Sequence, residues 1–301
     1  GRLIYFSIFK NGIYKRQVLS QQNYSSEMLP YKRGDILDRD GNTLATSQKM
    51  YTLVLEPKNI LRSEEVQKAT IDALHKYMKL DEDKLLKFIK RHKDSYYSVY
   101  REELSYSQIA DLKDFIASDK AENVSGIVFN EKYKRRYPNQ SLASQVIGFV
   151  SDGMIGTGGI EQYYNSTLSG VDGRKYKYLN EELEQDSSIV EPENGKTVVT
   201  TIDSNIQKLA EDQLSKFEKK YGSKGSSILV MNPNNGEIYA MVNVPEYDLN
   251  DPFSLSAKKR KANSKKQQEY LNKKWRNSCL NDTYEPGSIF KIVSRNVLAL
   301  S

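Results

Sequence analysis

Hydrophobic positions in the first part of the chain follow two different periods. Apolar residues recur at helical spacing over residues 1–28 and again over residues 63–92. Between these segments, residues 33–56 alternate apolar and polar positions around a turn-forming Asp-Gly-Asn sequence at residues 40–42. The pattern therefore predicts helices on either side of two strands that are joined by a tight turn.

A mixed block over residues 61–125 interrupts the strand-type sequence. After the predicted helices it contains a short predicted strand at residues 96–101 and a predicted helix at residues 107–117. Strand-type sequence returns at residues 124–130. We therefore expect residues 61–125 to form an α/β head that is inserted into a β-rich N-terminal part.

The sequence changes character again in its second half. Residues 176–195 are charged, poor in apolar side chains and end in Glu-Pro-Glu-Asn-Gly, which is typical of a linker. Residues 197–202 are apolar and β-branched and predict a buried strand. Asp203 or Ser204 then caps a helix, in which Ser204 and Gln207 have the spacing of a capping box.

A β-hairpin is the clearest element of the second half. Residues 228–231 and 238–242 are apolar strands on either side of Asn-Asn-Gly at residues 234–236, which favours a tight turn. Strand, helix and hairpin together indicate an α+β domain. We therefore divide the chain into a first domain of residues 1–195 and a second domain of residues 196–301.

Composition restricts the chemistry more than it restricts the fold. Of 301 residues, 38% are hydrophobic, 28% charged and 10% aromatic, so a folded globular protein is expected. The one cysteine, Cys279, excludes an intrachain disulfide and a thiolate zinc cluster. We expect Cys279 to be a small packing residue; a metal ligand that acts with groups outside this chain is the alternative. His75 and His92 are expected on helix surfaces, and no cofactor is predicted.

The N-terminus carries a signal for a membrane anchor. Although no apolar run reaches the about 18–20 residues that a spanning helix needs, Gly1–Phe9 is largely apolar and Lys10 follows it. This stretch fits the last turns of a membrane helix, and the start of an ordinary amphipathic helix is the alternative. We expect the natural protein to continue upstream into a single membrane helix, with the bulk of the chain outside the cytoplasm.

Basic residues concentrate in residues 258–276, which contain nine Lys or Arg against one acid, Glu269. The net charge of the whole chain is +6. We expect this segment to be a solvated basic loop or helix, and a contact surface for an anionic polymer is the alternative. Nucleic acid is not a predicted partner, because only Tyr270 and Trp275 could stack on bases and no recognised module surrounds them.

The sharpest chemical feature lies near the C-terminus. Pro286 and Gly287 precede Ser288, and an apolar helical pattern follows, so Ser288 should stand at a helix start. There the free backbone N–H groups favour a developing negative charge. Lys291 lies one turn further on the same face. A desolvated lysine in that place can take the proton of the Ser288 hydroxyl and so activate it as a nucleophile.

The Ser-x-x-Lys spacing alone is not specific, because it occurs three times in this chain. It also starts at Ser7, in the apolar N-terminal stretch, and at Ser256, in the lysine-rich run. Only Ser288 follows a Pro-Gly helix start and heads an apolar helix. We therefore predict Ser288 and Lys291 as the catalytic residues; the Ser–Lys pair needs no histidine.

The sequence Glu-Pro-Gly-Ser around Ser288, followed by Phe-Lys, resembles the nucleophile motif of penicillin-binding proteins. Other segments are similar to motifs of the high-molecular-weight class B members and occur in family order. They are the pedestal signature at residues 33–45, later pedestal motifs at residues 136–138, 148–150 and 159–170, the start of the transpeptidase domain at residues 201–207 and its first hairpin at residues 234–241. The short segment between Gly148 and Gly159 resembles septal-type members, which serve division or the spore cortex.

This resemblance implies an α+β fold, with an elongated β-rich N-terminal pedestal or dimerisation domain that carries the inserted α/β head. The first part of a penicillin-binding transpeptidase domain, an antiparallel sheet with helices, would follow. The resemblance also implies a membrane-anchored peptidoglycan D,D-transpeptidase that works through a Ser288 acyl-enzyme. The implied partners are peptidoglycan stem peptides, β-lactam antibiotics, a glycosyltransferase and other divisome or spore-cortex proteins.

One departure from the family pattern concerns the C-terminal end. The family's Ser-x-Asn and Lys-Thr/Ser-Gly motifs lie well downstream of the nucleophile, whereas only 13 residues follow Ser288. We therefore expect this chain to be C-terminally incomplete and inactive by itself. A non-catalytic scaffold of a cell-wall synthesis complex is the alternative function. A penicillin-sensing receptor or serine β-lactamase is less favoured, because such proteins need no pedestal motifs. Arg33, Asp38 and Arg39 are expected to be structural, as an ion-pair network.

Overall fold

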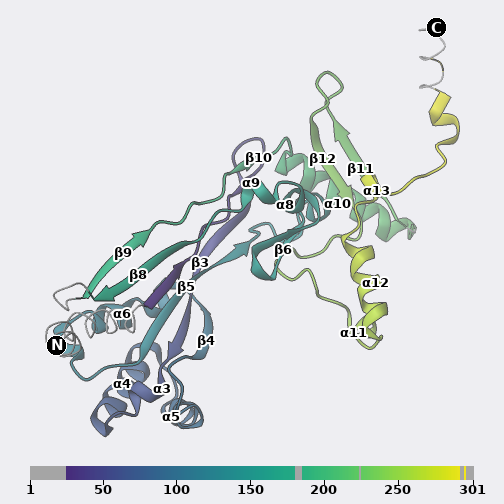
Figure 1. Cartoon of the computed structure of the whole chain (residues 1–301). Helices are drawn as coiled ribbons and strands as arrows, with labels where there is room; N and C mark the ends of the chain where they lie inside the picture. Colours follow the sequence, from purple (N-terminus) through teal and green to yellow (C-terminus); the bar gives the residue numbers. More distant parts are fainter. Residues whose placement is uncertain (1–24, 180–184, 224, 292–294, 296–301) are drawn as a thin grey trace, which may run out of the picture. The chain divides into compact units, whose positions relative to one another are not determined.

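The structure is a computed structural model that describes residues 25–179, 185–223, 225–291 and 295 (Figure 1). The chain folds into two compact units whose segments alternate along the sequence. The first unit comprises residues 1–35, 46–136 and 166–197, and the second comprises residues 36–45, 137–165 and 198–301. The division into sequence domains at residues 195 and 196 stays a prediction, since the compact units follow contacts and interleave.

An antiparallel arrangement around the long strand β3 organises the first unit. Ten residues of β3 (Thr43–Leu55) pair in register with β5 (Ile127–Arg136). The last part of β3 also pairs with β4 (Ser98–Leu104), with irregularities in the register. The strands that the sequence predicts before and after the inserted block are therefore confirmed.

Helices pack against these strands to form the core of the first unit. They are α3 (Pro57–Ile60), α4 (Glu64–Met78), α5 (Glu82–Arg91), α6 (Tyr106–Ile116) and the short 3-10 helix η1 (Asp119–Ala121). The side chain of Asp81 accepts a hydrogen bond from the backbone N–H of Lys84 and starts α5. The predicted helical segment over residues 63–92 is therefore two helices. Their buried apolar side chains meet those of the strands, among them Leu53, Leu55, Leu74, Leu85, Ile89 and Ile109.

A three-stranded antiparallel sheet includes part of the predicted linker. Strand β8 (Gly173–Leu179) lies between β1 (Ser25–Leu29) and β9 (Gln185–Val190). Residues 176–179 and 185–190 of the predicted linker are therefore strands, and the assignment of residues 176–195 as the linker between two domains stays a prediction. Hydrophobic patterning missed these strands because the segment has few apolar residues, and Ile189 and Val190 are about half exposed. Residues 25–28, which were expected to be helical, belong to β1, and residues 1–24 lie outside the described part of the chain.

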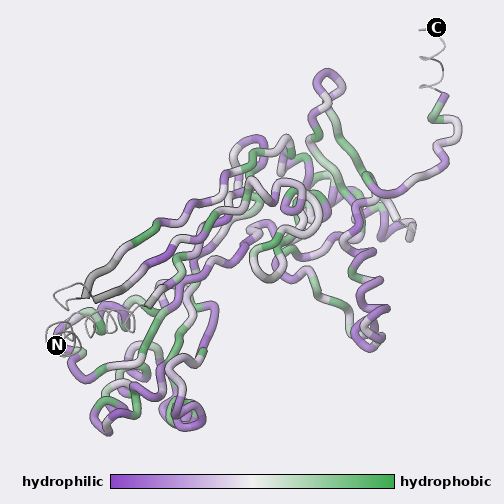
Figure 2. The backbone as a smooth tube through the Cα atoms, viewed as in Figure 1, coloured by the Kyte–Doolittle hydropathy of each residue, from purple (hydrophilic) through white to green (hydrophobic). Residues whose placement is uncertain are grey.

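The second unit contains a hairpin that packs on a long helix. Strands β11 (Ser227–Met231) and β12 (Ile238–Asn243) pair antiparallel, and α10 (Ser204–Tyr221) covers one face of the pair. Their buried contacts involve Ala210, Leu214, Ala240 and Val242. Figure 2 shows hydrophobic residues along both strands. The hairpin that the sequence predicted is confirmed, with Gly236 at a positive φ of 79° in its turn.

Two short strands, β2 and β10, connect residues 36–45 of the second unit with its segment that starts at residue 198. Strand β2 (Ile36–Leu37) pairs antiparallel with the beginning of β3 and parallel with β10 (Val198–Val199). The buried strand expected over residues 197–202 is thus limited to two residues, and Val199 is 62% exposed. The tight turn at residues 40–42 is confirmed, because the Gly41 N–H donates to the Asp38 carbonyl and Gly41 has a φ of +86°.

The start of α10 differs from the predicted capping box. Asp203 is the N-cap, and its carboxylate accepts hydrogen bonds from the N–H groups of Asn205 and Ile206. Gln207 is fully buried, and its side-chain amide bonds to Glu211 and to the backbone of Met241. The capping-box prediction was therefore wrong, because burial against β12 gives Gln207 stronger partners than the helix end.

An aromatic cluster holds the remaining segments of the second unit. Phe149 has its ring centroid 5.0 Å from that of Trp275 and 5.5 Å from that of Phe253. The shorter elements here are α7 (Ser144–Ile147), β6 (Phe149–Ser151), η2 (Asp152–Met154), β7 (Ile155–Thr157) and α8 (Gly159–Tyr163); α9 (Asn165–Leu168) follows them. Among the described residues, no helix is both long and apolar enough to cross a bilayer.

Candidate nucleophile site

The predicted nucleophile lies in a short 3-10 turn, η3 (Gly287–Phe290), which Pro286 precedes. Gly287 has a φ of +58°, a conformation that favours glycine directly before Ser288. The backbone N–H of Lys291 donates to the carbonyl of Ser288, so one turn joins the two predicted site residues. The sequence predicted a helix start at Ser288, whereas the described residues form a single 3-10 turn. Most of the apolar helix predicted after Ser288 lies outside the described part of the chain, and the catalytic assignment of Ser288 and Lys291 stays a prediction.

The surroundings of this turn are exposed. Ser288 and Lys291 are both exposed, Ile289 is 70% exposed and Phe290 is 54% exposed. The apolar side chains that directly follow Ser288 are therefore not buried by the described residues. Burial of this turn needs apolar surface from elsewhere, and the described residues do not provide it.

Cys279 and the two histidines have local structural partners. Cys279 lies in α13 (Ser278–Asn281), is half-buried, and burial raises the pKa of its thiol, so the unreactive thiol form is favoured. The Nδ1 atoms of His75 and His92 lie 2.8 and 2.9 Å from the carbonyl oxygens of Leu80 and Phe88. Among the residues that the structure describes, no group of three or more His, Cys, Asp or Glu side chains could hold a metal ion.

Asp38 is a fully buried carboxylate of the second unit that several hydrogen bonds stabilise. Burial opposes its ionisation, but hydrogen bonds from the Ser204 hydroxyl and from Asn42 outweigh this and lower the pKa of Asp38 to about 2. Arg39 has another partner, because its guanidinium lies 3.9 Å from the carboxylate of Glu237. Arg33 is fully buried and donates to the Ser169 hydroxyl. Arg33, Asp38 and Arg39 thus have structural partners: the Ser169 hydroxyl for Arg33, the Ser204 hydroxyl and Asn42 for Asp38, and the Glu237 carboxylate for Arg39.

Sequence reasoning missed two coupled carboxyl groups in the second unit. Glu211 is buried and accepts hydrogen bonds from the Ala143 N–H and from Gln207, each at 2.8 Å. Burial raises the pKa of Glu211. Burial together with the charges of Glu211 and Asp212 raises the pKa of Glu246 to about 7. No sequence signal could have found this pair, because 35 positions separate Glu211 from Glu246.

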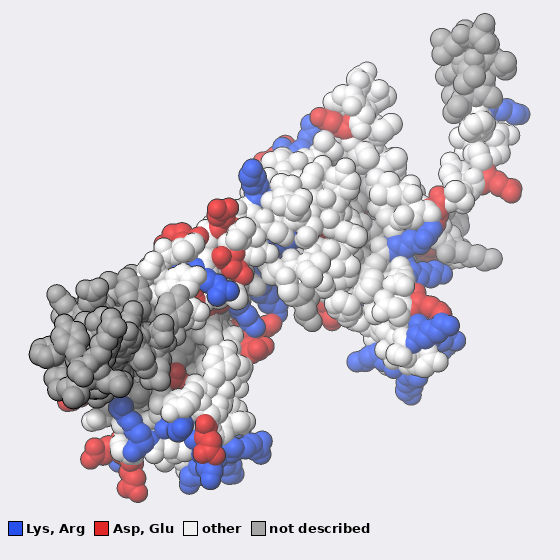
Figure 3. All heavy atoms as spheres, in the orientation of Figure 1, with Lys and Arg blue, Asp and Glu red and all other residues white. Residues whose placement is uncertain are grey.

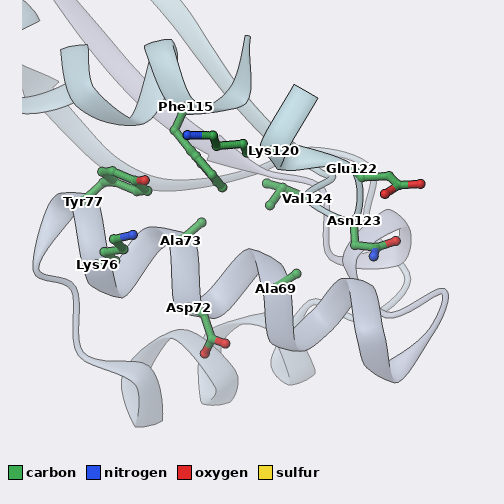
Figure 4. Close-up of a pocket in the computed structure, with 10 residues that line it drawn as sticks. All are labelled: Ala69, Asp72, Ala73, Lys76, Tyr77, Phe115, Lys120, Glu122, Asn123 and Val124. Carbon is green, nitrogen blue, oxygen red and sulfur yellow. The ribbon is translucent and has the colours of Figure 1, made fainter. Parts of the chain in front are cut away.

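A pocket of about 340 Å³ lies in the first unit, between α4 and the segment that contains α6 and η1 (Figure 4). The rings of Tyr77 and Phe115 stack at 4.8 Å on one side of it. Lys76 and Lys120, with Asp72 and Glu122, contribute opposite charges to its lining. None of the predicted site residues takes part in this pocket, which therefore does not extend the nucleophile site.

Comparison with known protein families identifies the family to which a chain with this turn and these two units belongs. The family model of the penicillin-binding protein dimerisation domain matches residues 29–200, and the model of the penicillin-binding protein transpeptidase domain matches residues 226–300. The first match alone spans more than half of the chain. The protein therefore belongs to the penicillin-binding proteins, and its domain order and relatives place it in class B.

Individual relatives agree with this assignment. Stage V sporulation protein D of Bacillus subtilis is 29% identical over 280 residues, which are 89% of this chain and 39% of that protein. The probable peptidoglycan D,D-transpeptidase PenA of Neisseria gonorrhoeae is 28% identical over 272 residues, which are 88% of this chain and 42% of that protein. The chain thus spans about two fifths of the length of these relatives.

A solved structure supports the fold. Penicillin-binding protein 2X of Streptococcus thermophilus superposes with a TM-score of 0.62 and 25% identity, over 75% of this chain and 36% of that one. The predicted family and the α+β fold class, with a dimerisation part before a transpeptidase part, are therefore confirmed.

Proposed function

We propose that the natural protein is a peptidoglycan D,D-transpeptidase that cross-links stem peptides through an acyl-enzyme on Ser288. The observation that carries this proposal is the turn at Ser288 and Lys291, which lies inside the segment that matches the transpeptidase domain. The related Neisseria gonorrhoeae protein is named a probable peptidoglycan D,D-transpeptidase, which supports the reaction class.

The proposed reaction has two steps. In the first, the Ser288 oxygen attacks the carbonyl of the D-Ala–D-Ala bond while Lys291 accepts the hydroxyl proton. Lys291 passes this proton to the nitrogen of the terminal D-Ala as the C–N bond breaks, so D-Ala leaves with a free amine and the carbonyl carbon stays bound to the Ser288 oxygen. In the second step, an amine of a neighbouring stem peptide attacks the ester carbonyl carbon and the C–O bond to Ser288 breaks. The cross-link forms, and Lys291 transfers a proton from the attacking amine to the Ser288 oxygen. β-Lactams would acylate Ser288 in the same way as the dipeptide.

The turn offers one candidate donor for the oxyanion hole of this reaction. The backbone N–H of Ser288 is a candidate for one donor of the oxyanion hole, which stabilises the negative oxygen of the tetrahedral intermediate. The exposure of Lys291 implies that the working site needs further residues that desolvate this lysine and supply a second donor. For this reason the proposal concerns the natural protein rather than the isolated turn.

The setting of the reaction is part of the same proposal. The protein would be held at the cell membrane, with the bulk of the chain outside the cytoplasm, and the apolar composition of residues 3–9 supports this. The partners would be stem peptides, a glycosyltransferase and other proteins of division or of the spore cortex. The name of the Bacillus subtilis relative, a sporulation protein, supports the septal or sporulation type.

Covalent labelling of the full-length natural protein with fluorescent penicillin tests this proposal. The variant Ser288→Ala should lose the label completely, because the attacking oxygen is absent. Lys291→Ala should slow acylation by about 10²–10⁴-fold, the usual range for loss of a general base. Ser256→Ala is the matched control, since Ser256 has the same spacing to Lys259 and lies in the same unit, and it should label normally. A labelled peptide that contains another serine would overturn the assignment.

A further inference from the structure

One short segment of the second unit carries all of the chain's excess positive charge. The chain has 45 basic and 39 acidic residues, and residues 258–276 contain nine of the basic residues and one of the acids. The rest of the chain therefore has 36 basic and 38 acidic residues. The positive charge is thus a local feature of this segment and not a property of the whole protein surface.

Two helices present this charge. They are α11 (Ala257–Arg260) and α12 (Ser264–Trp275). Asn263 caps α12 by accepting a hydrogen bond from the backbone N–H of Lys266. The side-chain amide of Gln267 donates to the carbonyls of Arg260 and Ala262, at 3.0 and 2.7 Å. These bonds hold the end of α11 against α12, so the two helices bring their basic residues close together.

The opposite side of α12 is anchored in the protein. Leu271 is buried, and the ring of Trp275 packs against Phe149 while its N–H donates to the Pro252 carbonyl at 3.0 Å. The Lys274 ammonium donates to the carbonyls of Pro252 and Ser254. The apolar and aromatic groups of the helix are therefore used for packing, which leaves its polar side for other contacts.

The remaining cations face solvent. Arg276 pairs with Asp282, but seven other basic residues are exposed, and none of them makes an ion pair with another described residue. They are Lys258, Lys259, Arg260, Lys261, Lys265, Lys266 and Lys273. Figure 3 shows blue side chains gathered where Figure 1 labels α11 and the start of α12. Such a concentration of like charge costs free energy through mutual repulsion, which a polyanion would relieve.

We propose that the α11–α12 surface binds a flexible anionic polymer that carries phosphate groups along its backbone. The surface has many charges and few shaped contacts, which suits a regularly charged chain better than a small ligand. Six of the seven exposed cations are lysines, which act as point charges and bind phosphate without the paired geometry of arginine. Binding is therefore governed by charge and by the release of counterions.

Two other anionic partners fit this surface less well. Helices that insert into a membrane surface expose large apolar side chains opposite their lysines, whereas Leu271 and Trp275 are turned into the protein. Single-stranded nucleic acid binds to exposed aromatic side chains by stacking, whereas the ring of Tyr270 already lies under the Lys259 ammonium, 5.2 Å away. A polymer that uses only its phosphates needs neither feature.

Fluorescence anisotropy of end-labelled inorganic polyphosphate with the full-length natural protein tests the proposal. With seven contacts, affinity should fall roughly 1,000-fold between 50 and 200 mM salt, and with three contacts only roughly 20-fold. The test variant changes Lys258, Lys261, Lys265 and Lys266 to Gln and should show the weaker dependence. Changing the same four residues to Arg keeps the charge and should keep the steep dependence.

A variant with the same loss of charge elsewhere is the matched control. It changes Lys84, Lys87, Lys90 and Lys93, which are exposed on and beside α5, to Gln. This control should bind polyphosphate as the unchanged protein does. An equal loss in the control, or no binding by the unchanged protein, would overturn the proposal. Phosphatidylglycerol vesicles are the second probe; binding to them that equals or exceeds binding to polyphosphate, per phosphate, would make the membrane surface the partner and would also overturn it.

Discussion

Removal of the buried amide of Gln207 should destabilise the second unit strongly. Its Oε1 accepts a hydrogen bond from the Met241 N–H at 2.8 Å, and its Nε2 donates to the Met241 carbonyl at 3.1 Å. A neighbouring β-strand would make the same pair of bonds. The Gln207 amide, which belongs to α10, thus takes the place of a neighbouring strand at the edge of β12. The same Nε2 atom also donates a hydrogen bond to Glu211 at 2.8 Å.

The magnitude follows from the groups that Gln207→Ala leaves without partners. Met241 is only 5% exposed, so its backbone N–H and carbonyl would be buried and unpaired. Each such group costs about 1–3 kcal/mol, which gives a loss of about 2–6 kcal/mol in the free energy of unfolding. Had Gln207 belonged to a capping box, the loss would be about 1 kcal/mol or less. The two interpretations therefore predict results that are clearly different.

Urea unfolding measures this loss with a reporter in the same unit. Trp275 is the only tryptophan of the chain and packs against Phe149, so its fluorescence follows the second unit. With a denaturant slope of about 2 kcal/mol per molar, the midpoint should fall by about 1–3 M. Gln207→Leu keeps the volume without the hydrogen bonds and should lose nearly as much. Gln213→Ala, an exposed position of the same helix, should change stability by less than about 0.5 kcal/mol. Equal midpoints for Gln207→Ala and Gln213→Ala would refute the reasoning.

Two further predictions concern the second unit. Because hydrogen bonds lower the pKa of Asp38 from 3.8 to about 2, its ionised form contributes about 2 kcal/mol of stability above pH 4, which is lost as the pH falls toward 2. Comparison of acid unfolding with Asp38→Asn should show a shallower pH dependence in the variant, and identical profiles would contradict this. Gly148→Ala should destabilise by several kcal/mol, because Gly148 has a φ of +74° and the new Cβ would lie 2.1 Å from the Gly158 carbonyl oxygen. Gly41→Ala also has a positive φ but meets no atom within 4 Å, so thermal unfolding should show a loss of only about 1 kcal/mol.

The sequence determined the features whose causes lie within a few residues. Asn-Asn-Gly at residues 234–236 joins two apolar strands, and the structure places a hairpin there with Gly236 at positive φ. Asp203 was one of two predicted caps and starts α10. The Pro-Gly pair before Ser288 predicted a helix start, and the described residues form a short 3-10 turn there. In each case a backbone conformation and the residue that favours it are neighbours, so the information is local.

Tertiary structure decided the features that depend on distant partners. The polar strands β8 and β9 form because β8 also pairs with β1, about 150 positions earlier in the chain, and no alternation of apolar residues announces this. Gln207 leaves the helix end for Met241, 34 positions away, because a buried backbone edge must be satisfied. Local sequence likewise supplied the turn at Ser288 and Lys291, whereas burial of a lysine depends on which surfaces pack around it. Hydrogen-bond pairing and desolvation are properties of packed neighbours, and only the folded chain brings those neighbours together.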